Sequence, residues 1–388
     1  MIRTTCSGKT VSTAAVEEMN QAFWHIGLGL DKLWERKMKY FGHRLLILVF
    51  IFSVVVSFIN GDPLVPAICI FGDSVMDTGN NNHLKTLFRA NFLPYGRDFE
   101  AHKPTGRFCN GKLAADYIAE YIGFETYPPP YLSRSNVSLL LGGANFASAG
   151  SGYAHQTARL YKAISLPRQL LYYQEWQNQV VGMVGNERAT AIFSSGIHIL
   201  SAGTSDFLQN YYINPALKKL YTPSKIAHIL LTSYYTFVEN LYELGVRRIG
   251  VTTLPPVGCL PGSITVFGSG KNECVHRINK DAVMFNNKLN DTSQDLVANY
   301  PDLKLVVFDI YHPLLNLITK PSDNGFFESR RGCCGSGIVE TSLFCNARSI
   351  GTCSNATGYV FWDGFHPTEA ANQILAQNLL EQGLGLIS

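Results

Sequence analysis

Three side chains that lie far apart in the sequence have the types and local settings that nucleophilic catalysis requires. Ser74 lies in the stretch IFGDSVMDTGNNN, directly after an apolar run, and a serine hydroxyl becomes an effective nucleophile when a neighbouring base takes its proton. Asp363 and His366 lie three residues apart, just ahead of Pro367. With that spacing the carboxylate can accept the Nδ1–H bond of the imidazole, so that Nε2 faces a serine. Ser74, His366 and Asp363 are therefore predicted to be nucleophile, base and orienting group.

Each of these signals has a plainer alternative when it is taken alone. An Asp-x-x-His segment is more often a loop carboxylate that caps a surface histidine, and Gly-Asp-Ser can be a strand end followed by a turn. The G-x-S-x-G elbow of many hydrolases does not occur in the sequence, which disfavours that strained turn. We expect no other histidine to be paired in this way: His198 is predicted to be a core residue on a strand, and His83 and His312 are predicted to lie on loops.

The elements that must position these side chains are predicted from short apolar segments rich in Ile, Val and Phe. The five expected strands cover residues 67–71, 143–147, 197–202, 248–254 and 303–310. Longer segments with apolar residues at three- and four-residue steps lie between and after them, which is typical of amphipathic helices. Strands that alternate with helices imply right-handed crossovers and a parallel sheet covered on both faces. The sequence therefore predicts one α/β/α domain.

Polar, glycine-bearing segments follow three of the expected strands. They are Gly72-Asp73-Ser74, the stretch NFASAGSG with Gly150 and Gly152, and the stretch GTSD with Ser205. Glycine lets the backbone approach a ligand closely, and ligands of parallel sheets bind at the carboxyl ends of the strands. We expect these segments to converge on one rim of the sheet.

Length and composition indicate a globular protein rather than a disordered one. The chain has 388 residues, of which 46% are hydrophobic and 16% are charged, so it can bury a large core. Its net charge of +3 is spread without a long basic run, which argues against a nucleic acid or an acidic polymer as partner.

The N-terminal region has the profile of a secretory signal. An apolar run over residues 45–59 follows several basic residues and precedes the break NGDP. The run is shorter than the roughly 20 apolar residues of a spanning helix, so no stable membrane span is expected after cleavage. We predict that the protein starts at Met38, so that residues 1–37 are a doubtful N-terminal extension. A signal peptide then covers residues 38–61, and a single domain covers 62–388.

Cysteines and glycosylation sequons agree with export. Cys6 lies in the doubtful extension, and an even number of eight cysteines remains. Cys69 is predicted to be a buried free thiol, whereas Cys333, Cys334, Cys345 and Cys353 are expected to staple a Gly-rich loop. A zinc site is the alternative, but paired C-x-x-C spacing is missing. The three sequons lie at Asn136, Asn290 and Asn355. They favour a secreted protein, extracellular or in the cell wall.

Taken together, these blocks resemble the GDSL lipase/esterase family of the SGNH hydrolase superfamily, and particularly its secreted plant members. FGDSVMDTGNN, NFASAGSG, SAGTSDF and VFWDGFHPTEAAN are similar to the four blocks of that family, in order. PTGRFCNGKLAADYIAE and RRGCCGSG are also similar to regions of the plant proteins. The likeness covers about residues 64 to 385 and is more specific than any single motif.

The resemblance implies a flavodoxin-like, three-layer fold with a five-stranded parallel sheet. It also implies hydrolysis of carboxylic esters through an acyl-serine, without a metal or an organic cofactor. Matched position by position, Ser74 is similar to the family's nucleophile, His366 to its base and Asp363 to the partner of that base. The backbone N–H groups of Ser74 and Gly150 are implied to be oxyanion donors.

The chain departs from the family pattern at two positions. The signature reads GDSV, which changes a packing residue, and Ser205 stands where the third block usually has an asparagine that donates to the oxyanion. A serine hydroxyl also donates but is shorter, so we expect a slower esterase rather than an inactive one. Asp73 and Asp77 are interpreted as hydrogen-bonding groups that shape the loop, not as proton carriers.

Three functions remain open on these grounds. The leading hypothesis is a secreted serine ester hydrolase that acts on a small-molecule or lipid acyl ester. An acyltransferase that builds a polyester would use the same triad, and a catalytically weak binding protein could keep the same fold. An acyl pocket could be lined by aromatic residues, although such residues more often belong to the core. The aromatic candidates are Phe207, Tyr211, Tyr212 and Phe267.

Overall fold

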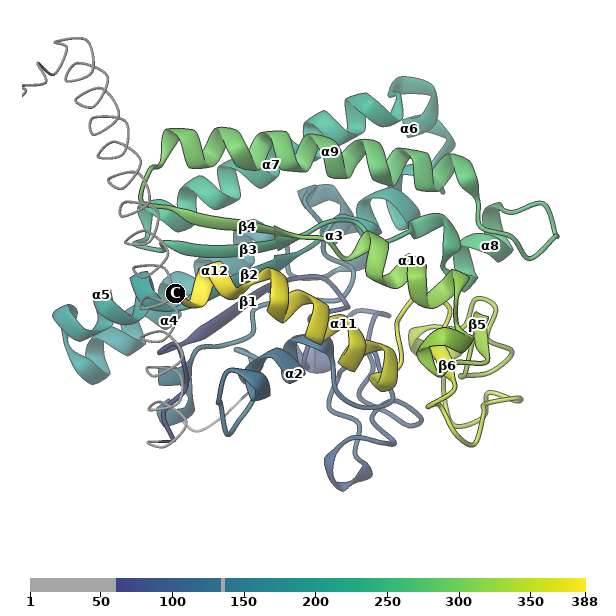
Figure 1. Cartoon of the computed structure of the whole chain (residues 1–388), viewed down its shortest axis with the longest axis horizontal. Coiled ribbons are helices and arrows are strands. Elements are labelled where there is room, and N and C mark those ends of the chain that lie inside the picture. Colours follow the sequence, from purple (N-terminus) through teal and green to yellow (C-terminus); the bar gives the residue numbers. More distant parts are fainter. Residues whose placement is uncertain (1–60, 134–136) are drawn as a thin grey trace, which may run out of the picture. The chain divides into compact units, whose positions relative to one another are not determined.

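The computed structural model, which describes residues 61–133 and 137–388, is built around a parallel sheet (Figure 1). The four strands are β1 (Ile68–Gly72), β2 (Ile197–Ser201), β3 (Arg248–Thr252) and β4 (Lys304–Phe308), in that spatial order. All pairs are parallel, with Gly72 opposite Ser201 and Thr252 opposite Phe308. The carboxyl ends of the strands therefore lie along one edge of the sheet, as the sequence predicted.

The expected strand over residues 143–147 forms only isolated bridges, so the prediction of five regular strands is wrong by one. Asn145 bridges Ile70 on one side and Pro130 on the other. The Ile70 N–H donates to the carbonyl of Ala144 at 3.0 Å, which places this segment at the edge beside β1. Its outer neighbour contains three consecutive prolines, which lack N–H donors and stop the ladder. With this segment beside β1, the spatial order is still flavodoxin-like.

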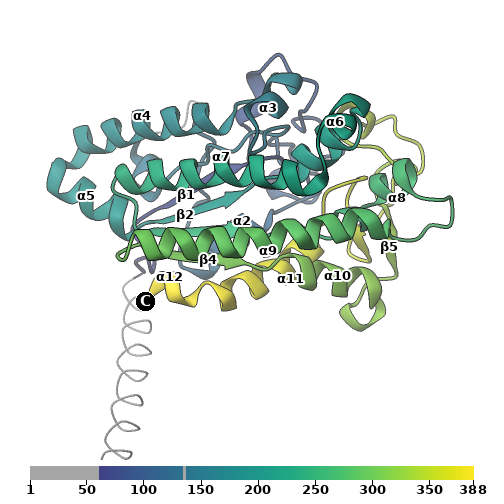
Figure 2. The same cartoon turned by 90° about the horizontal axis from the view of Figure 1, so that it is seen from above.

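Helices cover both faces of the sheet, because alternate strand residues point to opposite sides. Cys69 and Phe71 of β1 pack toward one group of helices, whereas Ile68 and Ile70 pack toward the other. The first group consists of α4 (Leu166–Val184), α7 (Pro223–Glu243) and α9 (His276–Asn299). The second group consists of α2 (Ala114–Tyr121), α11 (Glu369–Gln382) and α12 (Leu384–Ile387). Figures 1 and 2 show α7 and α9 on one side of the strands and α11 and α12 on the other. The predicted α/β/α class is confirmed.

Shorter elements complete this part of the chain. The remaining α-helices are α3 (His155–Tyr161), α5 (Asn186–Ser195), α6 (Pro215–Leu220), α8 (Pro261–Phe267) and α10 (Tyr311–Thr319). A second, two-stranded parallel sheet joins β5 (Glu328–Gly332) to β6 (Tyr359–Phe361). The segment between β6 and α11 carries both Asp363 and His366, so this small sheet helps to position the predicted base.

Six cysteines form three disulfides. The pairs are Cys259–Cys274, Cys333–Cys353 and Cys334–Cys345, while Cys69 and Cys109 are buried free thiols. The predicted local staple of a Gly-rich loop is thereby confirmed. Among residues 61–133 and 137–388, no three His, Cys, Asp or Glu side chains are grouped so that they could hold a metal ion.

The predictions about the N-terminus and about export fall partly outside the described residues. Residues 1–60 and the sequon at Asn136 lie outside them, so the extension, the signal peptide and that glycosylation site stay predictions. Asn290 and Asn355 are both exposed, as an acceptor of a glycan must be. No helix in the part of the chain that the structure describes is long and apolar enough to cross a membrane.

Candidate active site

The turn after β1 explains why a buried strand ends in Gly-Asp-Ser. Gly72 has a φ of 134°, and a Cβ at this position would lie 1.9 Å from the carbonyl oxygen of Ser201, so only glycine fits. The Gln169 side chain both accepts the Gly72 N–H and donates to the Gly72 carbonyl, each at 2.9 Å. The Asp73 carbonyl then accepts the N–H groups three and four residues further on. This turn presents Ser74, which is half-buried, at the end of the strand.

The segment after β6 brings the imidazole of His366 against the hydroxyl of Ser74. His366 Nε2 lies 2.7 Å from Ser74 Oγ, although 292 positions separate the two residues in the sequence. Its Nδ1 lies 2.8 and 2.9 Å from the two carboxylate oxygens of Asp363. Because a carboxylate accepts, Nδ1 carries the proton and Nε2 is left to accept from Ser74. The Trp362 N–H donates to the His366 carbonyl at 2.8 Å, and the Phe108 ring packs 5.0 Å from the imidazole centroid.

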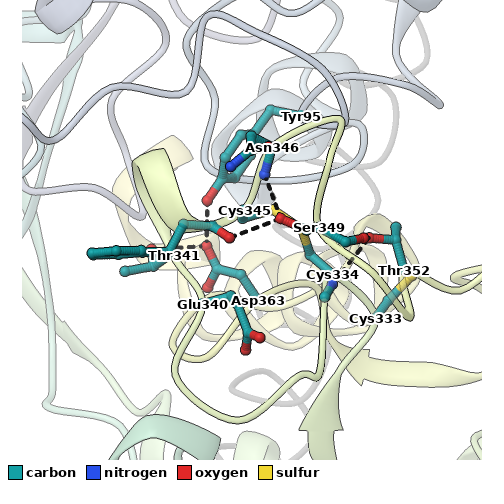
Figure 3. The surroundings of a disulfide bond; sticks show 12 residues. Tyr95, Cys333, Cys334, Glu340, Thr341, Cys345, Asn346, Ser349, Thr352 and Asp363 are labelled. Atoms are coloured by element: carbon teal, nitrogen blue, oxygen red, sulfur yellow. Dashed lines mark hydrogen bonds between the residues drawn. A yellow bond between two sulfur atoms is a disulfide. The ribbon is translucent and has the colours of Figure 1, made fainter.

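Asp363 is completely buried and is held by two side chains that the sequence analysis did not identify. The Tyr95 hydroxyl donates to Asp363 Oδ2 at 2.7 Å, and the Thr341 hydroxyl donates to the same oxygen at 2.9 Å (Figure 3). Tyr95 in turn accepts the Ser342 N–H at 2.8 Å. Burial and the neighbouring Asp363 carboxylate raise the pKa of Tyr95 well above its usual value. Tyr95 therefore stays a neutral donor at any physiological pH.

The loop that supplies Thr341 and Ser342 is closed by a disulfide. Cys334 and Cys345 are joined across eleven positions, and between them lie Thr341, which bonds to the carboxylate, and Ser342, which bonds to Tyr95. Figure 3 shows Thr341 directed from this loop toward Asp363, with Tyr95 approaching from another segment. The cysteine spacing was the one signal in the sequence for this support, because neither Tyr95 nor Thr341 belongs to a recognisable motif.

Buried carboxylates tie the loops at the carboxyl edge of the sheet to one another. Asp77 accepts the Ala149 N–H at 3.0 Å, and Asp206 accepts the Tyr153 N–H at 2.7 Å. Burial raises the pKa of Asp77 and of Asp206 to about 6, against the hydrogen bonds that lower it. Burial also raises the pKa of Asp73 to about 7, although nearby His366 lowers it. The predicted convergence of these loops on one rim is confirmed, and Asp77 shapes the loop as expected.

The backbone positions expected to bind an oxyanion have unpaired donors. Within the described residues, no hydrogen bond uses the N–H of Ser74 or of Gly150. Gly150 has a φ of 84°, and a Cβ there would lie 3.1 Å from the Cβ of Tyr161. Ser205 is only 3% exposed, and its hydroxyl bonds to no other residue in the described ranges. All three positions therefore keep a donor available.

A second Asp-x-x-His pair corrects one expectation from the sequence. His312 Nδ1 lies 2.7 Å from Asp309 Oδ2, at the same spacing as the pair at the candidate site. Asp309 also accepts the N–H groups of Tyr311 and His312, so His312 lies in the first turn of α10 and not on a loop. The His312 side chain is 76% exposed. In this pair a carboxylate caps a helix and holds a surface histidine. This is the arrangement that an Asp-x-x-His segment usually adopts, and it differs from that of Asp363 and His366.

The other two histidines that the sequence analysis considered take no part in the candidate site. His198 on β2 is 1% exposed, and its Nε2 lies 2.9 Å from the Tyr173 hydroxyl. Burial lowers the pKa of His198 to about 4. The predicted core histidine is thereby confirmed. His83 is exposed, in a short helical turn after β1.

The aromatic residues considered for an acyl pocket belong to the core instead. Phe207 packs edge-on against Phe285, with ring centroids 5.6 Å apart, and Tyr212 lies 5.8 Å from Phe267. Phe207, Tyr211 and Tyr212 are each at most 4% exposed. A different, apolar cavity lies beside the predicted nucleophile, between Val75 and residues on either side of His366.

Comparisons with known proteins identify the family of the chain. A family model described as GDSL-like Lipase/Acylhydrolase matches residues 68–379. Three Arabidopsis thaliana proteins named GDSL esterase/lipase are similar over most of the chain. At5g03820 is 61% identical over 88% of this chain and 99% of its own. At5g03810 is 63% identical over 85% of this chain and 94% of its own. At3g53100 is 57% identical over 91% of this chain and 100% of its own.

Among solved structures, that of Bacillus subtilis YXIM is 11% identical, with a TM-score of 0.34 over 82% of this chain and 56% of its own. A similarity of that size supports no conclusion about this protein. The family model and the Arabidopsis relatives confirm the resemblance that the four sequence blocks indicated. The chain belongs to the GDSL-like lipase/acylhydrolase family.

Proposed function

We propose that the protein is a secreted serine hydrolase that cleaves carboxylic acyl esters through an acyl-Ser74 intermediate. Its family makes it a carboxylic ester hydrolase that acts on a small-molecule ester. The single observation that carries the finer proposal is the 2.7 Å contact between His366 Nε2 and Ser74 Oγ, with Asp363 on the other ring nitrogen. This is the geometry of a nucleophile, a base and an orienting carboxylate.

The proposed reaction has two steps of acyl transfer. His366 takes the proton of the Ser74 hydroxyl while the oxygen attacks the ester carbonyl, and Asp363 stabilises the imidazolium that forms. The imidazolium then gives its proton to the leaving alcohol as the carbon–oxygen bond breaks, which leaves an acyl-serine. Water, deprotonated by His366, attacks this ester, and the proton returns to Ser74 as the carboxylic acid leaves.

The negative oxygen of each tetrahedral intermediate needs donors. The unpaired N–H groups of Ser74 and Gly150 are proposed for this role, together with the Ser205 hydroxyl. Preorganised donors of this kind stabilise the charge that develops in the transition state without having to reorient during the reaction. Asp73 and Asp206, held among backbone donors nearby, complete the loops that carry these groups.

The Ser205→Asn variant should turn over faster than the natural enzyme. An asparagine amide reaches further than a serine hydroxyl, and one oxyanion donor is worth about 2.7 to 4 kcal/mol, so kcat on a p-nitrophenyl ester should rise on the order of tenfold or more. Ser205→Ala, which removes the hydroxyl, should lower kcat. An unchanged kcat in both variants would show that position 205 does not contact the oxyanion.

Tyr95→Phe should lower kcat about tenfold and leave KM unchanged, because a hydrogen bond to a charged group is worth about 1.5 to 3 kcal/mol. Without this donor the Asp363 carboxylate is held less firmly against His366 Nδ1. Thr341→Val, which removes the second hydroxyl from the same carboxylate oxygen, should also lower kcat.

The matched control for this pair is Tyr121→Phe. The Tyr121 hydroxyl is buried without a hydrogen-bond partner among the described residues, so its loss should leave kcat unchanged. If Tyr95→Phe behaves like this control, then the hydroxyl of Tyr95 does not support Asp363 during the reaction.

Product analysis tests the proposed hydrolysis directly. The purified protein, supplied with an acyl ester in water that contains a competing alcohol, should release mainly the free acid. Mass spectrometry of rapidly quenched protein should find the acyl group on the peptide that contains Ser74. A new ester as the main product would instead identify an acyltransferase, and no acyl adduct with no turnover would favour a binding protein.

Export is the remaining part of the proposal. Three disulfides and two exposed sequons, at Asn290 and Asn355, support passage through an oxidising secretory route. N-terminal sequencing of the protein recovered outside the cell should find a chain that begins near Asp62. A peptide from residues 1–37 in the native protein would contradict the predicted start at Met38.

A further inference from the structure

We infer that the substrate's acyl group is a short aliphatic chain, received by the apolar cavity beside Ser74; this inference rests on the proposed function. The cavity lies between the residues that follow Ser74 and the residues that flank His366. Val75 and Met76 line it on one side, and Phe365 and Pro367 line it on the other. Ser74 and His366 do not line the cavity themselves, but each is the chain neighbour of residues that do.

The deeper wall of the cavity is aliphatic. Ala114 from α2, Leu314 from α10, and Leu375 and Leu379 from α11 contribute to it. The three leucines are each at most 3% exposed, so they are fixed in the packed layer between the sheet and these helices.

Four of the five polar side chains that line the cavity make hydrogen bonds within the protein. Thr252 Oγ1 donates to Ser201 Oγ at 2.8 Å, and the Asn372 amide donates to the Lys112 carbonyl at 3.1 Å. Thr253 Oγ1 accepts the Ile310 N–H at 3.0 Å. Among the described residues, no charged side chain lines the cavity. A charged or strongly polar occupant would lose hydrogen bonds to water with little replacement, so the lining favours an apolar occupant.

The size of the cavity limits the length of the chain. Its volume is about 80 Å³. An apolar protein cavity of about 150 Å³ accommodates benzene, with six carbons, so this one has room for about three or four. A longer chain would have to displace Leu375 or Leu379, which are held by the surrounding core. Esters of two to four acyl carbons are therefore the expected substrate class.

The inference is tested with p-nitrophenyl acetate, butyrate, octanoate and laurate on the purified full chain. For the natural enzyme, kcat/KM should be at least about tenfold higher for butyrate than for laurate, because one poorly placed methylene in an apolar pocket lowers kcat/KM about 10- to 200-fold. Leu379→Ala lengthens the cavity and should raise the ratio of octanoate to butyrate by about tenfold. Leu380→Ala removes the same atoms from the next residue of α11, which does not line the cavity, and should leave the ratio unchanged.

A second variant keeps the test decisive if Leu379→Ala folds poorly. Ala114→Leu fills the cavity and should lower kcat/KM for butyrate about tenfold while acetate is nearly unaffected. Equal rates on laurate and butyrate, or ratios unchanged in both cavity variants while acetate is hydrolysed, would overturn the inference and leave the proposed hydrolase standing. No hydrolysis of any of the four esters, with no acyl adduct on Ser74, would overturn both.

Discussion

Ser74→Ala should abolish measurable ester hydrolysis, with kcat reduced on the order of 10⁴- to 10⁶-fold, because nucleophile and base act as one unit. The hydroxyl is the only group that His366 Nε2 contacts in the described residues, so its removal leaves the base without a proton to take. Binding of the ester and the oxyanion donors remain, and they account for the small residual rate. The measurement is initial velocity on p-nitrophenyl butyrate, with the variant's fold checked by circular dichroism.

Labelling by a fluorophosphonate probe gives the same prediction a readout that does not depend on the substrate. The probe should attach to the natural protein and fail to attach to Ser74→Ala. Ser233→Ala is the matched control, because Ser233 lies on α7 and its hydroxyl donates only to the backbone of its own helix. That variant should keep full activity and labelling. A labelled Ser74→Ala protein, or one that keeps a tenth of the activity, would remove Ser74 from the mechanism.

Asp363→Asn should lower kcat by about 10⁴-fold while KM changes little, because a neutral amide no longer stabilises the imidazolium that forms on His366. The natural carboxylate accepts from His366 Nδ1, from the hydroxyls of Tyr95 and Thr341 on Oδ2, and from two backbone N–H groups on Oδ1. An asparagine at this position has one acceptor oxygen and an NH₂ group, so it cannot accept on both sides. In either orientation of the amide, His366 loses the negative charge beside Nδ1.

The chain contains its own control for this substitution. Asp309→Asn alters an Asp-x-x-His pair of the same spacing, which is exposed and capped onto α10. Asp309→Asn should leave kcat unchanged. It should lower the free energy of unfolding by at most about 0.5 to 2 kcal/mol, because only the capping interaction is weakened. Equal losses of activity from the two Asp→Asn variants would show that the effect of Asp363→Asn does not come from the orientation of His366.

Much of the candidate site could be predicted because its chemistry is recorded in short local patterns. The turn at Ser74, the spacing of Asp363 and His366, and the glycine-bearing strand ends each depend on residues within a few positions of one another. Parallel topology then requires the strand ends to share an edge, since the strands all point the same way. The disulfide staple was visible for the same reason, as its cysteines lie close together in the sequence.

Other features depend on residues that meet only after folding. Tyr95 and Thr341 are 246 positions apart in the printed sequence, yet both bond to Asp363 Oδ2. No local pattern distinguishes either residue from an ordinary tyrosine or threonine. The irregular edge segment at residues 143–147 likewise depends on its proline-rich neighbour, and not on its own apolar composition.

The two Asp-x-x-His pairs show which properties of a site can be predicted from the sequence and which cannot. The sequence by itself determined that an aspartate can hold an imidazole at this spacing, because the geometry of four consecutive residues is local. Only the tertiary structure decided that Asp363 is fully buried and that His366 lies 2.7 Å from a serine, whereas Asp309 and His312 face water. Burial and long-range proximity arise from how the whole chain packs, and the strength and direction of a proton transfer depend on both.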